Sequence, residues 1–185
     1  MKSIAAAFVL ALLVFASAYA APVPTINLIP SGGTVAGLPG TVVGWGYDIT
    51  NSDPSDWVLL NDSYVDGSLA TGTYGTYVDY ISADPNLIVI DPGSDSGPVP
   101  FSPGVSGVGE FDIDEFVPPL AITGDINIDY SVFSEDPNSP SFDPSSFVTS
   151  GTLTAPAQVD VVPEPASALL LGAALLPLAF RRPRR

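Results

Sequence analysis

The sequence predicts an all-β protein: a single antiparallel β-sandwich of Ig-like architecture, flanked by an N-terminal signal helix and a C-terminal membrane helix. Three observations lead to this fold class. Apolar and polar residues alternate with a period of two in several central segments, which directs one set of side chains inward. Clusters of Gly, Pro, Asp and Ser separate these segments, as turns do. Long apolar runs of helix-forming residues stand only near the two ends of the chain.

Residues 1–20 have the pattern of a secretory signal peptide. Lys2 supplies a positive n-region, residues 4–16 form an apolar h-region, and residues 18–20 are the small residues that a signal peptidase reads. Cleavage is therefore expected between Ala20 and Ala21, with signal peptidase as a partner. The alternative is an uncleaved N-terminal anchor.

Residues 21–160 form the predicted β-sandwich ectodomain. Apolar residues alternate with Gly, Asp and Thr over residues 43–50, and the pattern returns over residues 111–114 and 125–132. Further strand-like runs are Thr25–Ile29, Trp57–Leu60, Tyr74–Ile81, Leu87–Ile90 and Thr152–Val162. Seven to nine short strands at this spacing predict an antiparallel sandwich, with a small barrel as the alternative. The apolar residues are too regularly placed for a disordered chain.

The predicted ectodomain is a polyanion without cations. All five basic residues lie at the ends of the chain, as Lys2 and four terminal arginines. Of the 20 acidic residues only Glu164 lies outside residues 21–162, which leaves 19 negative charges there. No salt bridge can form within this segment, and nucleic-acid binding through a basic surface is excluded. Cysteine is absent, so no disulfide stabilises the fold.

The same composition restricts catalysis. The body has no His, Lys or Cys, which excludes a Ser-His-Asp triad, a Cys or Lys nucleophile and a zinc site built from His and Cys. A carboxylate pair or a calcium- or magnesium-assisted reaction remains. Asp112, Asp114 and Glu115 form the densest carboxylate cluster and are the candidates for such a hydrolase, which we rank last among the functions. We expect no enzyme.

Most carboxylates have a structural explanation. Aspartates that precede proline favour turns, in which the carboxylate accepts hydrogen bonds from nearby backbone amides. Five residues have this arrangement: Asp53, Asp84, Asp91, Asp136 and Asp143. The remaining acidic residues mostly alternate with apolar ones and are expected on solvated strand faces.

Calcium is the stronger candidate ligand, although no cofactor is required by the sequence. Asp125, Asn127 and Asp129 copy the first half of a calcium-binding loop, but Tyr130 stands where that loop needs Gly. On a strand, their oxygens would be spaced by roughly 6.6 Å, too far to converge on one ion. The loop of residues 91–97 can surround an ion more easily.

Aromatic residues raise a carbohydrate-binding alternative, because sugars stack on aromatic faces. The candidates are Trp45, Trp57, Tyr64, Tyr74, Tyr77 and Tyr80. Trp45 occupies the apolar side of its alternation, so packing in the core is the favoured explanation for it. The three tyrosines spaced by three residues fall on both faces of a strand, so some are expected to be exposed.

Residues 161–185 form a tail in three parts. Pro163, Glu164 and Pro165 give an extended polar motif, residues 166–180 an apolar helix, and residues 181–185 a basic end. The positive charges are Arg181, Arg182, Arg184 and Arg185. The apolar run is about 22 Å long as a helix, which is short for a membrane of about 30 Å, and Pro177 interrupts it. A plain membrane anchor and a buried core helix are the alternatives.

This order of parts at the end of the chain resembles the PEP-CTERM sorting signal of Gram-negative bacteria. The resemblance implies recognition and processing by exosortase, an integral membrane transpeptidase. It also implies an inner-membrane intermediate, held by the C-terminal helix, and then display at the cell surface or in the extracellular matrix. More loosely, residues 41–51 resemble a stretch in small exported domains that carry such tails and have no assigned activity.

The expected function is therefore an exported, surface-displayed, non-enzymatic protein associated with extracellular polysaccharide or biofilm matrix. A calcium- or carbohydrate-binding module is the alternative, and a carboxylate-pair hydrolase follows it.

Overall fold

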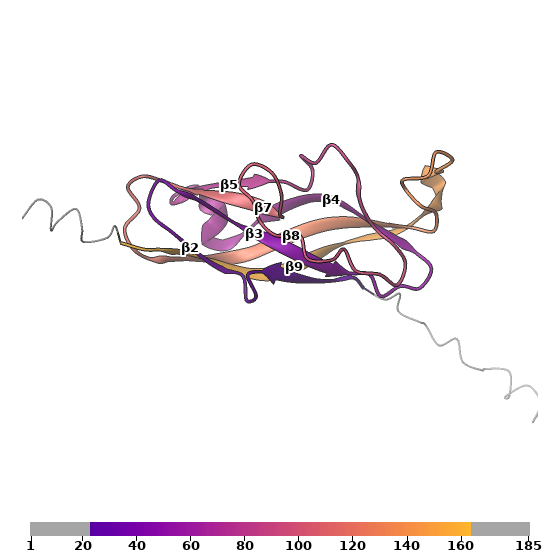
Figure 1. The fold of residues 1–185 in the computed structure, drawn as a ribbon, viewed down its shortest axis with the longest axis horizontal. Coiled ribbons are helices and arrows are strands. Elements are labelled where there is room, and N and C mark those ends of the chain that lie inside the picture. Colours follow the sequence, from indigo (N-terminus) through magenta and orange to yellow (C-terminus); the bar gives the residue numbers. More distant parts are fainter. Residues whose placement is uncertain (1–22, 164–185) are drawn as a thin grey trace, which may run out of the picture.

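The computed structural model describes residues 23–163, which form two β-sheets packed face to face (Figure 1). The strands are β1 (Thr25–Ile29), β2 (Thr34–Gly37), β3 (Val42–Thr50), β4 (Trp57–Val65), β5 (Gly75–Asp79), β6 (Ile88–Ile90), β7 (Gly109–Ile113), β8 (Ala121–Phe133) and β9 (Phe147–Val161). Two short 3₁₀ helices, η2 (Gly67–Thr71) and η3 (Pro144–Ser146), complete the elements. The predicted all-β sandwich with seven to nine strands is confirmed.

The two sheets have the strand orders β1-β3-β7-β5 and β2-β9-β8-β4-β6. The prediction of a purely antiparallel sandwich is wrong at one pair, because β2 runs parallel to β9 along its last residues. The chain leaves β1 in the first sheet and turns at residues 30–33, where the Gly33 amide donates to the Pro30 carbonyl. It thereby enters the second sheet at its edge, beside β9.

The core follows the alternation seen in the sequence. Trp45 and Phe111 are fully buried between the sheets, and the isoleucines of β8 meet them from the opposite side. The inward residues of the three period-two segments are Val43, Trp45, Tyr47, Ile49, Phe111, Ile113, Ile126, Ile128, Tyr130 and Val132, all buried. The predicted inward faces of these strands are therefore confirmed.

The outward face of β3 is covered, a feature that the alternation of residues along the strand does not predict. A Cβ atom on Gly44 would lie 2.3 Å from the Phe101 ring, and one on Gly46 would lie 2.2 Å from the Val99 carbonyl oxygen. These glycines therefore let the 99–101 segment lie directly on the strand. Tyr47 and Val99 exchange two backbone hydrogen bonds of 2.9 and 2.8 Å, which fix that segment in place.

Strand lengths depart from prediction in both directions. β9 begins at Phe147 rather than Thr152, and β4 continues past Leu60 through an irregularity of register to Val65. β5 is shorter than the predicted run, because the chain turns after Asp79. β2 was not predicted at all, since its four residues are too few to display a period.

β9 runs the length of the body, and its last residues (yellow) lie at the end opposite to the loop of residues 134–146 (orange; Figure 1). Within residues 23–163 no helix has the length and apolarity needed to cross a membrane. The predicted signal helix and C-terminal membrane helix both lie outside the described residues.

Candidate functional site

The junction between the body and the tail is tightly held. The Val161 amide donates to the Leu120 carbonyl and the Val162 amide to the Gly37 carbonyl, each at 2.9 Å. Pro163 follows directly and is exposed. The motif predicted for sorting therefore begins one residue after the last hydrogen bond of β9. The other predicted tail and signal residues lie outside the described residues: Ala20, Ala21, Glu164, Pro165, Arg181, Arg182, Arg184 and Arg185.

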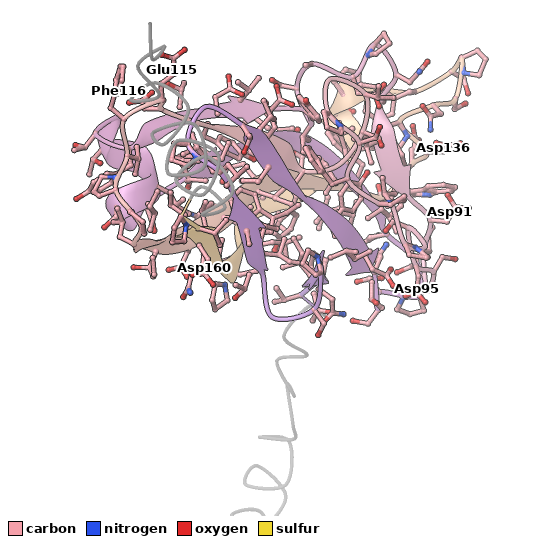
Figure 2. All side chains as sticks on the ribbon, turned by 60° about the vertical axis from the view of Figure 1, so that its left-hand side comes forward. Asp91, Asp95, Glu115, Phe116, Asp136 and Asp160 are labelled. Atoms are coloured by element: carbon pink, nitrogen blue, oxygen red, sulfur yellow. The ribbon has the colours of Figure 1, made fainter. Side chains whose placement is uncertain are left out.

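The loop of residues 114–120 lies at this same end, because Leu120 bonds to the end of β9. Phe116 at its tip is 92% exposed. Figure 2 shows Glu115 and Phe116 at one end of the body, and Asp91, Asp95 and Asp136 at the other. The tail junction thus shares its end with an exposed aromatic side chain.

The three carboxylates proposed for hydrolysis lie on or near this loop. Asp112, Asp114 and Glu115 are all exposed, while Phe111 and Ile113 between them point into the core. Asp114 and Glu115 line an open cavity of about 410 Å³ together with Tyr74 and Phe116, whereas Asp112 does not line it. The structure therefore does not bring the three carboxylates into one cavity.

The Asp-Pro turns form largely as predicted. Asp53 Oδ1 accepts from the amides of Ser55 and Asp56 at 2.9 and 3.0 Å. These hydrogen bonds hold the pKa of Asp53 below its ordinary value. Three more of the five aspartates accept an amide two residues ahead at 2.8 Å: Asp84, Asp136 and Asp143. Asp91 uses its backbone carbonyl instead, accepting from the Ser94 amide.

The residues of the predicted calcium half-loop are engaged in hydrogen bonds with neighbouring segments. Asp129 accepts from the Thr152 hydroxyl, and Asn127 Oδ1 accepts from the Thr154 hydroxyl at 2.8 Å. The Asp125 amide donates to Asp66 Oδ1 at 2.8 Å. Throughout residues 23–163, no three Asp or Glu side chains are grouped so that they could hold a metal ion.

Trp45 is a core residue, as favoured from its place in the alternation. Its indole N–H donates to the Gly33 carbonyl at 2.7 Å, deep inside the molecule. Tyr77 is also largely enclosed, beside the Ser63 hydroxyl at 2.8 Å. Tyr64 is the most exposed of the six candidate aromatics, at 44%.

A second cavity, of about 420 Å³, opens beside β3 and joins residues that are distant in the sequence. It lies between the end of β5 with the turn that follows it and the loop covering β3. Its lining includes Tyr47, Asp79, Tyr80, Asp84, Asn86 and Ser106. We call it the Tyr47 cavity. Of these residues, only Tyr80 was named as a sugar-binding candidate from the sequence.

The Tyr47 side chain is only 4% exposed, yet it lines this cavity. Burial and the nearby charge of Asp84 raise its pKa above the ordinary value. The phenol therefore stays protonated and can donate a hydrogen bond to a ligand in the cavity. Asp84 Oδ1 is partly occupied by the Asn86 amide, while Tyr80 bonds to Glu110 and to the Gly104 amide. The arrangement offers donors and acceptors to a polar ligand.

No protein-family model matches the chain, and no curated protein matches it. Among solved structures, WR4, a C. elegans MSP family member, is similar over 75% of this chain and 98% of its own, with 13% identity and a TM-score of 0.29. A chain of the CaDoc0917–CaCohA2 complex covers 76% and 100%, with 16% identity and a TM-score of 0.32. A chain of the Coh-OlpA–Doc918 complex, a type I cohesin–dockerin complex from Clostridium thermocellum, covers 76% and 100%, with 11% identity and a TM-score of 0.27. Similarities this low carry no conclusion about function.

Proposed function

We propose that this chain is an exported, non-enzymatic β-domain that an exosortase-like membrane transpeptidase sorts to the cell surface or the extracellular polysaccharide matrix. One observation carries the proposal furthest. The hydrogen bonds of β9 end at Val162, and the Pro163–Glu164–Pro165 motif follows without a linker at one extreme end of the body.

This placement determines how the body would be oriented at the membrane. A tail held in the inner membrane by residues 166–180 keeps the junction end of the body at the membrane surface. The prolines keep the motif out of any helix and Glu164 keeps it in water, so an enzyme in the membrane reaches it there. The arginines stop transfer, since each costs roughly 2.5–3.5 kcal/mol at the centre of a membrane helix. The opposite end, with Asp91, Asp95 and Asp136, then points away from the membrane.

The test is Glu164→Ala in a host that carries the sorting enzyme. We expect the variant to accumulate unprocessed in the inner membrane, while the wild type is shortened and leaves it. Glu115→Ala is the matched control, because it removes an exposed carboxylate from the same end of the body and should be processed normally. Equal size and location of the wild type and Glu164→Ala would refute sorting and leave a plain anchor.

The basic end has a separate role in this proposal. Deleting residues 181–185 removes the stop signal, so full-length protein should pass through the membrane before processing. Fractionation of inner membrane and culture medium measures this directly. Retention of the shortened chain in the membrane would contradict the role given to the arginines.

A second candidate function is binding of a neutral sugar unit, and the Tyr47 cavity is the observation that favours it. Its volume lies in the range typical of small-ligand pockets, and the protonated phenol of Tyr47 with Asp84 and Asn86 suits a polyhydroxyl ligand. The carboxylates repel anionic sugars, so the ligand is uncharged. Titration calorimetry with neutral oligosaccharides should show binding that Tyr47→Phe weakens and Tyr64→Phe does not. Equal affinity of the wild type and Tyr47→Phe would refute the site.

A further inference from the structure

Most of β9 is paired on one side only. β8 pairs with it from Phe147 to Asp160, whereas β2 pairs only with residues 158–161. Residues 147–157 therefore form an edge of the five-stranded sheet. We call the part from Ser150 to Thr154 the open edge of β9.

The direction of its hydrogen-bonding groups follows from the ends of the strand. The Val161 amide donates to Leu120 on the β8 side, whereas the amides of Gln158 and Val162 donate to Gly33 and Gly37 on the other side. Because directions alternate along a strand, even-numbered residues point their N–H and C=O groups outward. Pro156, which lacks an N–H, occupies one of these outward positions, as proline does at sheet edges.

Three residues of the open edge are outward by this rule: Ser150, Thr152 and Thr154. Within residues 23–163, no strand pairs with them on that side. Thr152 and Thr154 are exposed, and so are Phe147 and Val148 at the start of the strand. The open edge therefore presents backbone donors and acceptors to an approaching strand.

The open edge also lacks the usual protection against pairing. Proteins block such edges with charged side chains, prolines or bulges. Residues 144–159 contain no charged residue, although the body around them carries 19 acidic ones. The register shift near Phe133 and the proline at 156 limit the edge at its two ends but leave residues 150–154 unblocked.

We propose that two copies of this chain, once their tails no longer hold them at the membrane surface, pair antiparallel through the open edge of β9, joining their five-stranded sheets into one continuous sheet. Antiparallel pairing puts the two tail junctions at opposite ends of the dimer, so the dimer follows the processing proposed above. Two identical edges related by a twofold axis perpendicular to the sheet run antiparallel, and each contributes the same residues to the interface. An axis at Thr152 places Ser150 opposite Thr154 of the second copy, and small hydroxyl residues form favourable cross-strand pairs. The uncharged stretch is where a second copy of this polyanion meets the least repulsion.

The pairing predicts a particular response to salt. Repulsion between two bodies of like charge opposes the dimer, and added salt screens it. The dissociation constant of the dimer should therefore fall as salt rises. An interface held by attraction between opposite charges would weaken under the same conditions.

The first test is sedimentation of the full chain in detergent, with Thr152→Pro as the variant. The outward N–H of Thr152 makes no bond inside the sheet, so the substitution repeats at 152 what Pro156 does naturally. We expect a dimer in the wild type and a dissociation constant raised about tenfold or more in the variant, the loss expected for one or two hydrogen bonds. A wild-type monomer at high concentration in moderate salt overturns the proposal, and so does a folded variant that stays fully dimeric.

A second test does not depend on the folding of a proline variant. The chain has no cysteine, so Thr152→Cys provides one reactive thiol beside the twofold axis. Mild oxidation should link two copies through it. Thr123→Cys is the matched control, because Thr123 is exposed but lies on β8, an interior strand. Equal linking of both variants, or none at position 152, overturns the proposal.

Discussion

Asn51 is a buried polar residue that joins three parts of the chain. It is 1% exposed, and its side-chain amide donates to the carbonyls of Asp56 and Asp91 at 2.8 and 3.1 Å. Its Oδ1 accepts from the Asp53 amide at 3.1 Å. It therefore fixes the end of β3 to the turn after it and to the loop after β6.

We predict that Asn51→Ala lowers the free energy of unfolding by about 2–3 kcal/mol, because buried backbone groups lose their partners. Urea denaturation measures the change. Asn61→Ala is the control, since Asn61 is exposed and bonds only to the Ser131 side chain; we expect less than about 0.5 kcal/mol there. Equal effects of the two substitutions would contradict the role of Asn51.

Asp62 faces a second carboxylate across two strands. It pairs in register with Asp129 of β8. Partial burial, then the charges of Asp129 and Asp79, raise the pKa of Asp62 above its ordinary value. A raised carboxyl pKa means that the folded protein binds this proton more tightly than the unfolded chain does, so protonation of Asp62 stabilises the fold. Its contribution to stability is therefore complete below the ordinary pKa of an aspartate and is lost as pH rises through the raised value.

We predict that Asp62→Asn raises stability at neutral pH by less than about 1 kcal/mol, since solvent screens an exposed pair. The gain should vanish as pH falls to about 3–4, where the wild-type carboxyl is itself protonated. Urea denaturation at several pH values measures both. Glu115→Gln, which removes one charge from an exposed loop residue, should give a smaller gain. A gain that is unchanged at acid pH would contradict this explanation.

At the scale of the element, alternation in the sequence predicted the strands that carry the core. β3, β7 and β8 place their predicted residues inward because their inward sides are almost wholly apolar. β2 has no such signal, and its position depends on contacts with β9 far along the chain. The first residues of β9 were missed because Phe147, Val148 and Thr149 are exposed, so no alternation marks them.

The turn between β1 and β2 gives an element-scale prediction. Gly33 has φ +67°, and a Cβ atom there would lie 2.1 Å from the Pro156 carbonyl oxygen. Gly32 has φ +84°, but nothing lies within 4 Å of its Cβ position. Gly32→Ala therefore adds only the strain of a left-handed backbone, whereas Gly33→Ala adds that strain and a clash with β9.

We expect Gly32→Ala to lower the free energy of unfolding by about 1 kcal/mol and Gly33→Ala to lower it by about 3 kcal/mol. The indole of Trp45 donates to the Gly33 carbonyl, so displacing Gly33 alters the surroundings of this tryptophan. The change in tryptophan emission on unfolding should therefore be smaller for Gly33→Ala than for the wild type. Denaturation monitored by tryptophan emission measures both quantities. Equal costs for the two alanines would show that β2 is not held against β9 in the way described.

At the scale of the whole molecule, the sequence predicted the sandwich and the exclusion of whole classes of chemistry, because these follow from composition and periodicity. The candidate sites could not be predicted in the same way. The Tyr47 cavity joins residues from β3, the turn after β5 and the loop before β7, which only the folded chain brings together. The sequence predicts Tyr47 as a core residue. The structure buries its side chain, except where it lines the cavity.

The charge of the body leads to the last prediction. With 19 acidic residues and no cation between residues 21 and 162, folding concentrates like charges that the unfolded chain keeps farther apart. Salt screens this repulsion over about 8 Å at roughly 0.15 M. We therefore expect the melting temperature to rise with sodium chloride, by roughly 3–5 °C for each kcal/mol gained. Calcium at equal ionic strength is the informative comparison: an equal rise indicates screening alone, and a larger one indicates a bound ion. A melting temperature that stays flat from low to moderate salt would contradict the argument that self-repulsion destabilises the fold.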